Sequence, residues 1–262
     1  MTHQRARGHV AVSFAGERLG RLAQAGCGRI MMPRNAGGPP LAVVLNTAGG
    51  LTGGDRFAVE AELSEGARLA MTTQAAERAY RSIGGAARVE SRLRIGRGCT
   101  LWWLPQETIL FERSALARRL EVEMAEDACF IGLEMLVLGR RAMGETLAAA
   151  QLADRWRIRR GGRLAQAEAL RLGGDMAALA RAPALLDGAR AIGLMSCLAP
   201  GAEALLPQVR QALARDDLRA AASAWEGRIV VRMLAPDLAP LKALAARLVG
   251  VLGAQVPTVW QI

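Results

Sequence analysis

Hydrophobic residues alternate with polar ones through the first two thirds of the chain. Between positions 56 and 63 every second residue is apolar: Phe57, Val59, Ala61 and Leu63. A period of two is typical of a strand with one buried face. The same alternation predicts a strand at 10–14, and further short strands are predicted at 18–24, 29–32 and 68–72. An apolar run at 41–45 leads into a glycine-rich loop. Pro105 ends or bulges another strand, because proline cannot donate to a ladder.

A weak repeat runs through this region. An apolar residue, two mostly turn-type residues, a Gly or Asp, a small residue and a new apolar strand recur around Gly66, Gly98 and Asp127. These turn residues lie 32 (98 − 66) and 29 (127 − 98) positions apart. Hairpins repeated at near-constant spacing predict stacked β-layers, each burying its face on the next. We therefore predict a mainly β body over about 8–172, with a hairpin at its end whose turn is Gly161-Gly162.

The pattern changes after Gly173, and a mixed α/β part over about 173–262 is predicted within the same single domain, 1–262. Asp175 and Asp237 precede helical patterns and are suited to cap them. The predicted helices are 176–181, 202–213 (or a start at Pro207), 216–224 and one after Asp237, the last covering a sheet edge; the predicted strands are 190–198 and 228–234. A single helical turn is also predicted at 75–79.

Composition narrows the class of protein. The net charge is +10, but the basic residues are scattered and only one Tyr and four Phe are present, which does not favour nucleic-acid binding. The four cysteines are far apart and form no CxxC pair, so no disulfide framework is expected. No apolar run approaches the ~20 residues that span a membrane, and residues 1–14 lack the apolar core of a signal peptide. A cytoplasmic protein that binds no membrane is expected.

The available side chains exclude most common catalytic sites. His3 and His9 are the only histidines, and the sequence contains no HExxH or GxSxG motif and no Cys/His zinc set. What remains are carboxylates beside or within apolar strands: Asp55, Glu107, Glu134 and Glu168. Oxygen ligands hold a borderline divalent ion weakly compared with imidazole or thiolate. Such a set suits passing a metal on rather than storing it.

Glu134 is the most unusual of these acids. It lies within the otherwise apolar or glycine run 130–138, where a charge costs several kcal/mol unless it is paired. Arg140 and Arg141 are candidate partners. Glu107 follows Gln106 at the Pro105 break, where it is either partly buried or simply solvated in a turn.

A glycine-rich loop precedes the strand at 56–63. It contains Gly49, Gly50, Gly53 and Gly54 and ends at Asp55. A phosphate-binding loop would need a following lysine and a helix, and neither follows here. On local features the loop is a structural turn.

Four motifs in order resemble the UreD (UreH) family of urease accessory proteins. They are NTAGGLTGGD, ARLAMTTQAAERAYRS, LWWLPQETILFE and LEMLVLGRRAMGE, and they fall within residues 46–145. The resemblance implies stacked, β-helix-like sheets with a few C-terminal helices. It also implies a non-catalytic nickel-insertion chaperone that binds apo-urease and UreF, which recruits the GTPase UreG carrying Ni²⁺.

The resemblance further implies a water-filled tunnel that conducts Ni²⁺ in transit, with no tightly bound cofactor. Asp55, Glu134 and Glu168 would line this path, and Glu107 is a fourth candidate acid. The remaining motif or interior candidates are Gly49, Gly50, Gly53, Gly54, Thr72, Thr73, Gln74, Tyr80, Arg81 and Gln106. The sequence does not assign the surfaces that meet the partners.

Two other functions fit the sequence. A passive adaptor would hold UreF and UreG on urease while the metal travels elsewhere, and then the last helix would matter more than the interior acids. A carboxylate-based hydrolase would need two acids facing one cleft.

Overall fold

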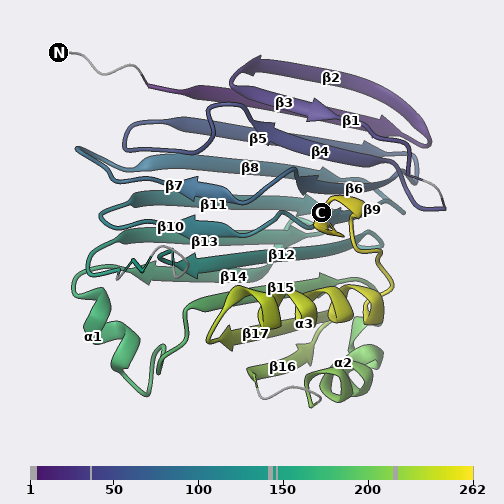
Figure 1. The fold of residues 1–262 in the computed structure, drawn as a ribbon. Helices are drawn as coiled ribbons and strands as arrows, with labels where there is room; N and C mark the ends of the chain where they lie inside the picture. The colour runs from purple at the N-terminus through teal and green to yellow at the C-terminus, as the bar shows by residue number, and fades with distance from the viewer. Residues whose placement is uncertain (1–4, 36, 141–143, 146, 215–217, 262) are drawn as a thin grey trace.

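The computed structural model describes residues 5–35, 37–140, 144–145, 147–214 and 218–261, which form two β-sheets packed face to face (Figure 1). In order across the sheet, sheet A consists of β14 (Arg163–Leu172), β13 (Gln151–Arg160), β11 (Ala115–Met124), β8 (Ala87–Ile95), β5 (Arg56–Ser64), β1 (Arg7–Ala15) and β2 (Arg18–Gly26). Sheet B consists of β16 (Arg219–Trp225), β17 (Arg228–Ala235), β15 (Ala191–Leu198), β12 (Cys129–Leu138), β9 (Thr100–Trp103), β6 (Arg68–Thr73), β4 (Leu41–Asn46) and β3 (Gly28–Met31). Two short strands, β10 (Thr108–Leu110) and β7 (Glu77–Ala79), extend from β12 off this path. The predicted mainly β, stacked architecture is confirmed.

The layers stack in chain order from β1 to β14 in sheet A and from β3 to β17 in sheet B, while β2 and β16 are added at the outer edges (Figure 1). In sheet A, β5, β8, β11 and β13 run parallel, and in sheet B so do β4, β6, β9 and β12. Each turn of the repeat therefore carries the chain from sheet A to sheet B. The prediction of hairpins at these turns is wrong, because the two flanking strands enter different sheets and pair with the next layer instead.

Small residues form the corners between the sheets. Ala67, Cys99 and Ala128 each follow a turn and are almost completely buried. The Thr100 amide donates to the Ala67 carbonyl at 2.9 Å, and the Cys129 amide donates to the Cys99 carbonyl at 2.9 Å. The corners thus stack in register with the strands, which accounts for the small residue in each repeat.

Both faces of the central strands of sheet B are buried. One face packs on sheet A through residues such as Phe130 and Leu136, and the other packs on C-terminal helices through Ile131, Leu133 and Met135. A strand covered on both faces needs apolar residues at every position. This explains why residues 130–138 form a nearly continuous apolar run.

Three helices accompany the C-terminal strands in the described part of the chain. α1 (Met176–Arg181) is capped by the Asp175 side chain, as predicted. α2 (Leu206–Leu213) begins beside Pro207, and a short 3-10 helix (Ala202–Leu205) precedes it. α3 (Leu238–Val251) begins after Asp237 and packs on β15 and β17, so it covers the face of sheet B rather than its edge.

Two helix predictions are wrong. Residues 77–79 form β7, since Glu77 and Ala79 lie beside β10 in a parallel pair. Residues 219–225 form β16, which pairs with β17, while 215–217 lie outside the described residues. In both segments pairing with a neighbouring strand overrides an alanine-rich composition that favours helix. No helix among the described residues is long and apolar enough to span a membrane.

The glycine loop lies against β7. Leu51 donates to the Arg78 carbonyl at 2.7 Å and accepts from the Tyr80 amide at 2.7 Å. Gly50 has φ +146°, and a Cβ atom there would lie 2.3 Å from the Tyr80 ring and 2.8 Å from the Arg78 carbonyl oxygen. The glycine is required by this close approach of two backbones.

Gly50→Ala should therefore destabilise the protein by about 1–3 kcal/mol, because it combines backbone strain with a clash against backbone. Urea unfolding followed by circular dichroism measures the change. Gly84→Ala is the matched control, since its Cβ would meet nothing within 4 Å. Equal stabilities of the two variants would contradict this account of the loop.

Candidate functional site

Two neighbouring cavities lie between the sheets. The first has a volume of about 270 Å³ and the second about 570 Å³, and both are partly open to solvent. Arg118, Glu134 and Asp154 line both cavities. We call these three residues the central cluster. The two cavities therefore adjoin at these three side chains.

Strand register brings the central cluster together. Arg118 on β11 and Asp154 on β13 are register partners in sheet A. Glu134 on β12 reaches them from sheet B. The Arg118 Nη1 atom donates to Glu134 Oε2 at 2.7 Å and to Thr108 Oγ1 at 3.0 Å, while Nη2 donates to an oxygen of Asp154. Trp103 Nε1 donates to the other Glu134 oxygen at 3.3 Å.

The central cluster contains two carboxylates and one guanidinium, all largely buried. The side chains of Arg118, Glu134 and Asp154 are 8%, 14% and 11% exposed. Burial alone would lower the pKa of Arg118, but the charges of Asp154 and Glu134 outweigh it and raise the pKa. Burial raises the pKa of Glu134, with Asp154 adding to the effect and Arg118 opposing it. The guanidinium is therefore charged, and its charge offsets that of the two carboxylates.

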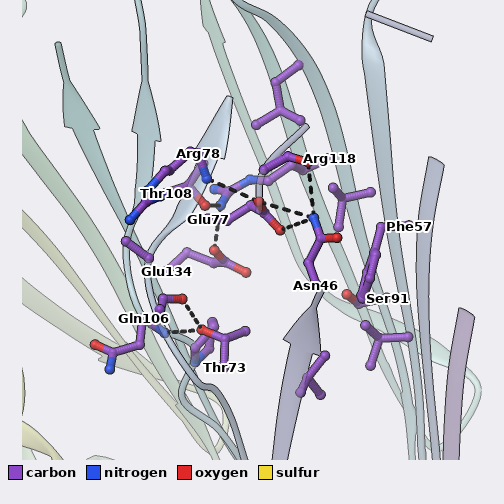
Figure 2. A pocket seen from close by; sticks show the side chains of 18 of the residues that line it. Asn46, Phe57, Thr73, Glu77, Arg78, Ser91, Gln106, Thr108, Arg118 and Glu134 are labelled. Carbon is purple, nitrogen blue, oxygen red and sulfur yellow. Dashed lines mark hydrogen bonds and ion pairs between the residues drawn. The ribbon is translucent and has the colours of Figure 1, made fainter. Parts of the chain in front are cut away.

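Polar side chains line the first cavity beyond the cluster (Figure 2). Asn46 on β4 donates to both oxygens of Glu77, at 3.1 and 3.4 Å, and the Arg78 amide donates to Glu77 at 3.1 Å. Burial raises the pKa of Glu77. Thr73 accepts from the Gln106 amide at 2.9 Å at the same cavity. Figure 2 shows these side chains directed into the space that Arg118 and Glu134 also face.

The second cavity is more apolar and contains one further ion pair. Arg232 donates to the two oxygens of Glu168 at 2.8 and 2.6 Å. Gln166 donates to Glu168 at 3.1 Å and to Ser196 at 2.9 Å. Trp156, the register partner of Glu168, forms part of the same wall. Carboxylates therefore occur at intervals from the first cavity to the second.

Asp55 and Glu107 lie apart from this series. Asp55 is buried and accepts from the amides of Ala6 and Thr52, both at 2.8 Å, so its carboxylate joins the glycine loop to the residue that precedes β1. Glu107 pairs with Lys242 of α3 at 3.4 Å, on the other face of sheet B. Among the described residues that line the two cavities, neither acid appears.

Some of the other predicted residues line the first cavity, and the rest lie outside both cavities. Those that line the first cavity are Gly49, Gly50, Thr73, Gln74 and Gln106. Thr72 instead accepts from Trp260 of the C-terminal 3-10 helix (Thr258–Gln261) at 3.2 Å, on the helix-covered face. Tyr80 donates to the Gly49 carbonyl at 3.3 Å, the Arg81 carbonyl accepts from Thr52 at 2.8 Å, and Gly53 and Gly54 belong to the loop.

The predicted partner of Glu134 is wrong. Arg140 pairs with Glu145 at 3.1 Å, and Arg141 lies outside the described residues. The sequence does hold a signal for the true partner. Arg118 interrupts the inward positions Leu116, Leu120 and Val122 of an alternating strand, and Asp154 interrupts Leu152, Trp156 and Ile158. A charge at an inward position of such a strand requires an opposite charge in a neighbouring layer.

The site is polar but is not a closed metal centre. Among the described residues no three His, Cys, Asp or Glu side chains are placed to hold a metal ion together. Two carboxylates with one guanidinium between them can bind a cation only weakly or by exchange. The two acids of the central cluster lie close together, and both accept hydrogen bonds from Arg118.

Comparisons with known proteins agree with the four sequence motifs found within residues 46–145. A family model described as UreD urease accessory protein matches residues 4–261. The urease accessory protein UreD of Jannaschia sp. (strain CCS1) is 50% identical over 262 residues, covering 100% of this chain and 97% of that protein. Those of Methylobacterium sp. (strain 4-46) and Rhizobium leguminosarum bv. trifolii (strain WSM2304) are 45% and 44% identical, covering 98% of this chain and 95% and 94% of theirs.

Glu77→Gln should reduce the pH dependence of stability. Because the folded-state pKa of Glu77 is raised above its ordinary value of 4.5, the folded state binds the proton more tightly. The stabilising contribution of Glu77 to the free energy of unfolding is thus fully present below pH 4.5, and it is lost as the pH rises through the raised pKa. The variant should gain stability relative to wild type over this window, measured by urea unfolding at a series of pH values. Glu62→Gln, on the exposed side of β5, is the control, and a parallel pH profile for Glu77→Gln and wild type would refute the effect.

Proposed function

The chain belongs to the UreD family of urease accessory proteins, and its role lies in urease maturation; from this premise we propose that it passes Ni²⁺ between its two sheets toward apo-urease. The path leads from the first cavity, past the central cluster, to the second cavity. On this proposal the chain acts in the cytoplasm within a complex. It receives the ion from UreG through UreF, and it catalyses no reaction of its own.

The observation that carries the proposal is the row of acids along the two cavities. Glu77 lines the first cavity, Glu134 and Asp154 line both, and Glu168 lines the second. Each of these carboxylates is hydrogen-bonded or ion-paired, which keeps a negative group stable in a partly buried position. Four carboxylates along one interior route offer a cation a series of negative groups, which supports transport.

The chemistry of the ligands supports transit. Ni²⁺ binds imidazole and thiolate more tightly than carboxylate, so an oxygen-lined path holds it briefly at each step. The apolar residues between the acids, including Trp156 and Leu194, leave few competing ligands. Each acid would then act as a stepping point and not as a store.

Replacing acids of the path should lower nickel loading. We expect Asp154→Asn and Glu168→Gln each to reduce the nickel content and activity of urease matured in cells severalfold, because each removes one stepping charge. Asp55→Ala should instead act through folding, since Asp55 closes a loop outside the cavities. Urease is purified from cells that co-express the accessory set, and its nickel is measured by mass spectrometry.

Glu90→Gln is the matched control, because Glu90 lies on the outward side of the same sheet in an exposed ion pair with Arg92. Co-purification of each variant with UreF and urease checks that the complex still assembles. Full nickel loading with an intact complex would favour the passive adaptor over the conduit.

A further inference from the structure

The central cluster divides the passage. Arg118, Glu134 and Asp154 line both cavities, so on the proposed route a cation passes beside the guanidinium. A fixed positive charge repels a divalent cation, and the repulsion is strong where water is largely excluded. A path through this point therefore requires that Arg118 move.

Arg118 cannot yield by losing its proton, because a guanidinium stays charged in proteins. It has to rotate away. Its two terminal nitrogens make its hydrogen bonds, whereas the buried Nε atom has no partner among the described residues. The side chain is thus held at its tip and not along its length.

The first cavity offers the guanidinium another carboxylate. Thr108, which accepts from Arg118, is the register partner of Glu77 in the β10–β7 pair. Neighbouring strands lie about 4.8 Å apart. Glu77 is therefore one strand spacing away from Thr108, to which Arg118 is already hydrogen-bonded. The donors bonded to Glu77 are the neutral Asn46 amide and the Arg78 backbone N–H.

We propose that Arg118 is an internal cation that a divalent metal displaces: the metal binds Glu134 and Asp154 when the guanidinium turns toward Glu77. The exchange balances charge, since two carboxylates then face a doubly charged ion and Glu77 receives the single charge of Arg118. The doubly charged metal neutralises the carboxylates of Glu134 and Asp154 more fully than one guanidinium does. This proposal rests on the proposed passage of Ni²⁺, but its test reads binding by the full chain alone.

Arg118→Met removes the competing cation at similar side-chain length. We expect the variant to bind Ni²⁺ about tenfold more tightly than wild type, because the metal no longer has to displace a charge from the two carboxylates. Isothermal titration of the full chain with nickel chloride measures the affinity. The gain should disappear in Arg118→Met/Glu134→Gln/Asp154→Asn, which keeps the shape of the cluster without its charges. Arg92→Met, at a surface ion pair, should leave the affinity unchanged.

Trp103 reports whether the ion occupies the expected place. Its indole donates to Glu134, so bound Ni²⁺ should quench its fluorescence, and Trp103→Phe should remove that part of the quenching. An Arg118→Met chain that binds no more tightly than wild type, or a gain that survives loss of both acids, overturns the proposal.

Glu77→Gln tests the same exchange without leaving two buried acids unpaired. The variant deprives the guanidinium of its second position, so Ni²⁺ affinity at the cluster should fall severalfold below wild type. Wild-type affinity in Glu77→Gln overturns the exchange even where Arg118→Met does not fold. Because binding is measured without urease, tighter binding in Arg118→Met together with normal nickel loading by the path variants would sustain the exchange and refute the conduit.

Discussion

Backbone hydrogen bonds between successive layers determine which interior side chains can meet. Parallel strands in register place inward residues of one layer beside those of the next, and the opposing sheet supplies the third neighbour. Arg118 and Asp154 meet because they are register partners, and Glu134 reaches both from across the core. A shift of one residue in β11 would turn Arg118 outward and leave two buried acids without a counter-charge. Register and electrostatics therefore depend on each other.

The sequence predicts the strands of the body best where only one face is buried, because apolar and polar residues then alternate. The alternation at 56–63, the small corner residues and the cap at Asp175 all depend on local patterns, and each agrees with the structure. The sheet to which a strand belongs is not a local property. The turn at Gly66 fits a hairpin and a corner equally well, and only pairing with the next layer distinguishes them.

The site is harder to predict for the same reason. The sequence identifies Glu134 and Glu168 as acids in apolar strands, and both line a cavity. Asp55 lies in the clearest motif, yet its carboxylate accepts hydrogen bonds from the backbone amides of Ala6 and Thr52 and does not line either of the two cavities. The partner of Glu134 is 16 residues away in sequence, in a different sheet, so proximity along the chain pointed to Arg140 instead. Single-sequence patterns show that a buried charge exists but not which layer neutralises it.

The layered arrangement also has a kinetic consequence. In the parallel part of the body, a strand pairs only with the equivalent strands of the preceding and following repeats. Such non-local pairing is slow to nucleate, after which neighbouring layers add in sequence. During synthesis the edge of the growing stack exposes unpaired backbone to other chains until the next coil covers it. Production of this protein should therefore be sensitive to temperature and expression rate, more so than its well-packed core suggests.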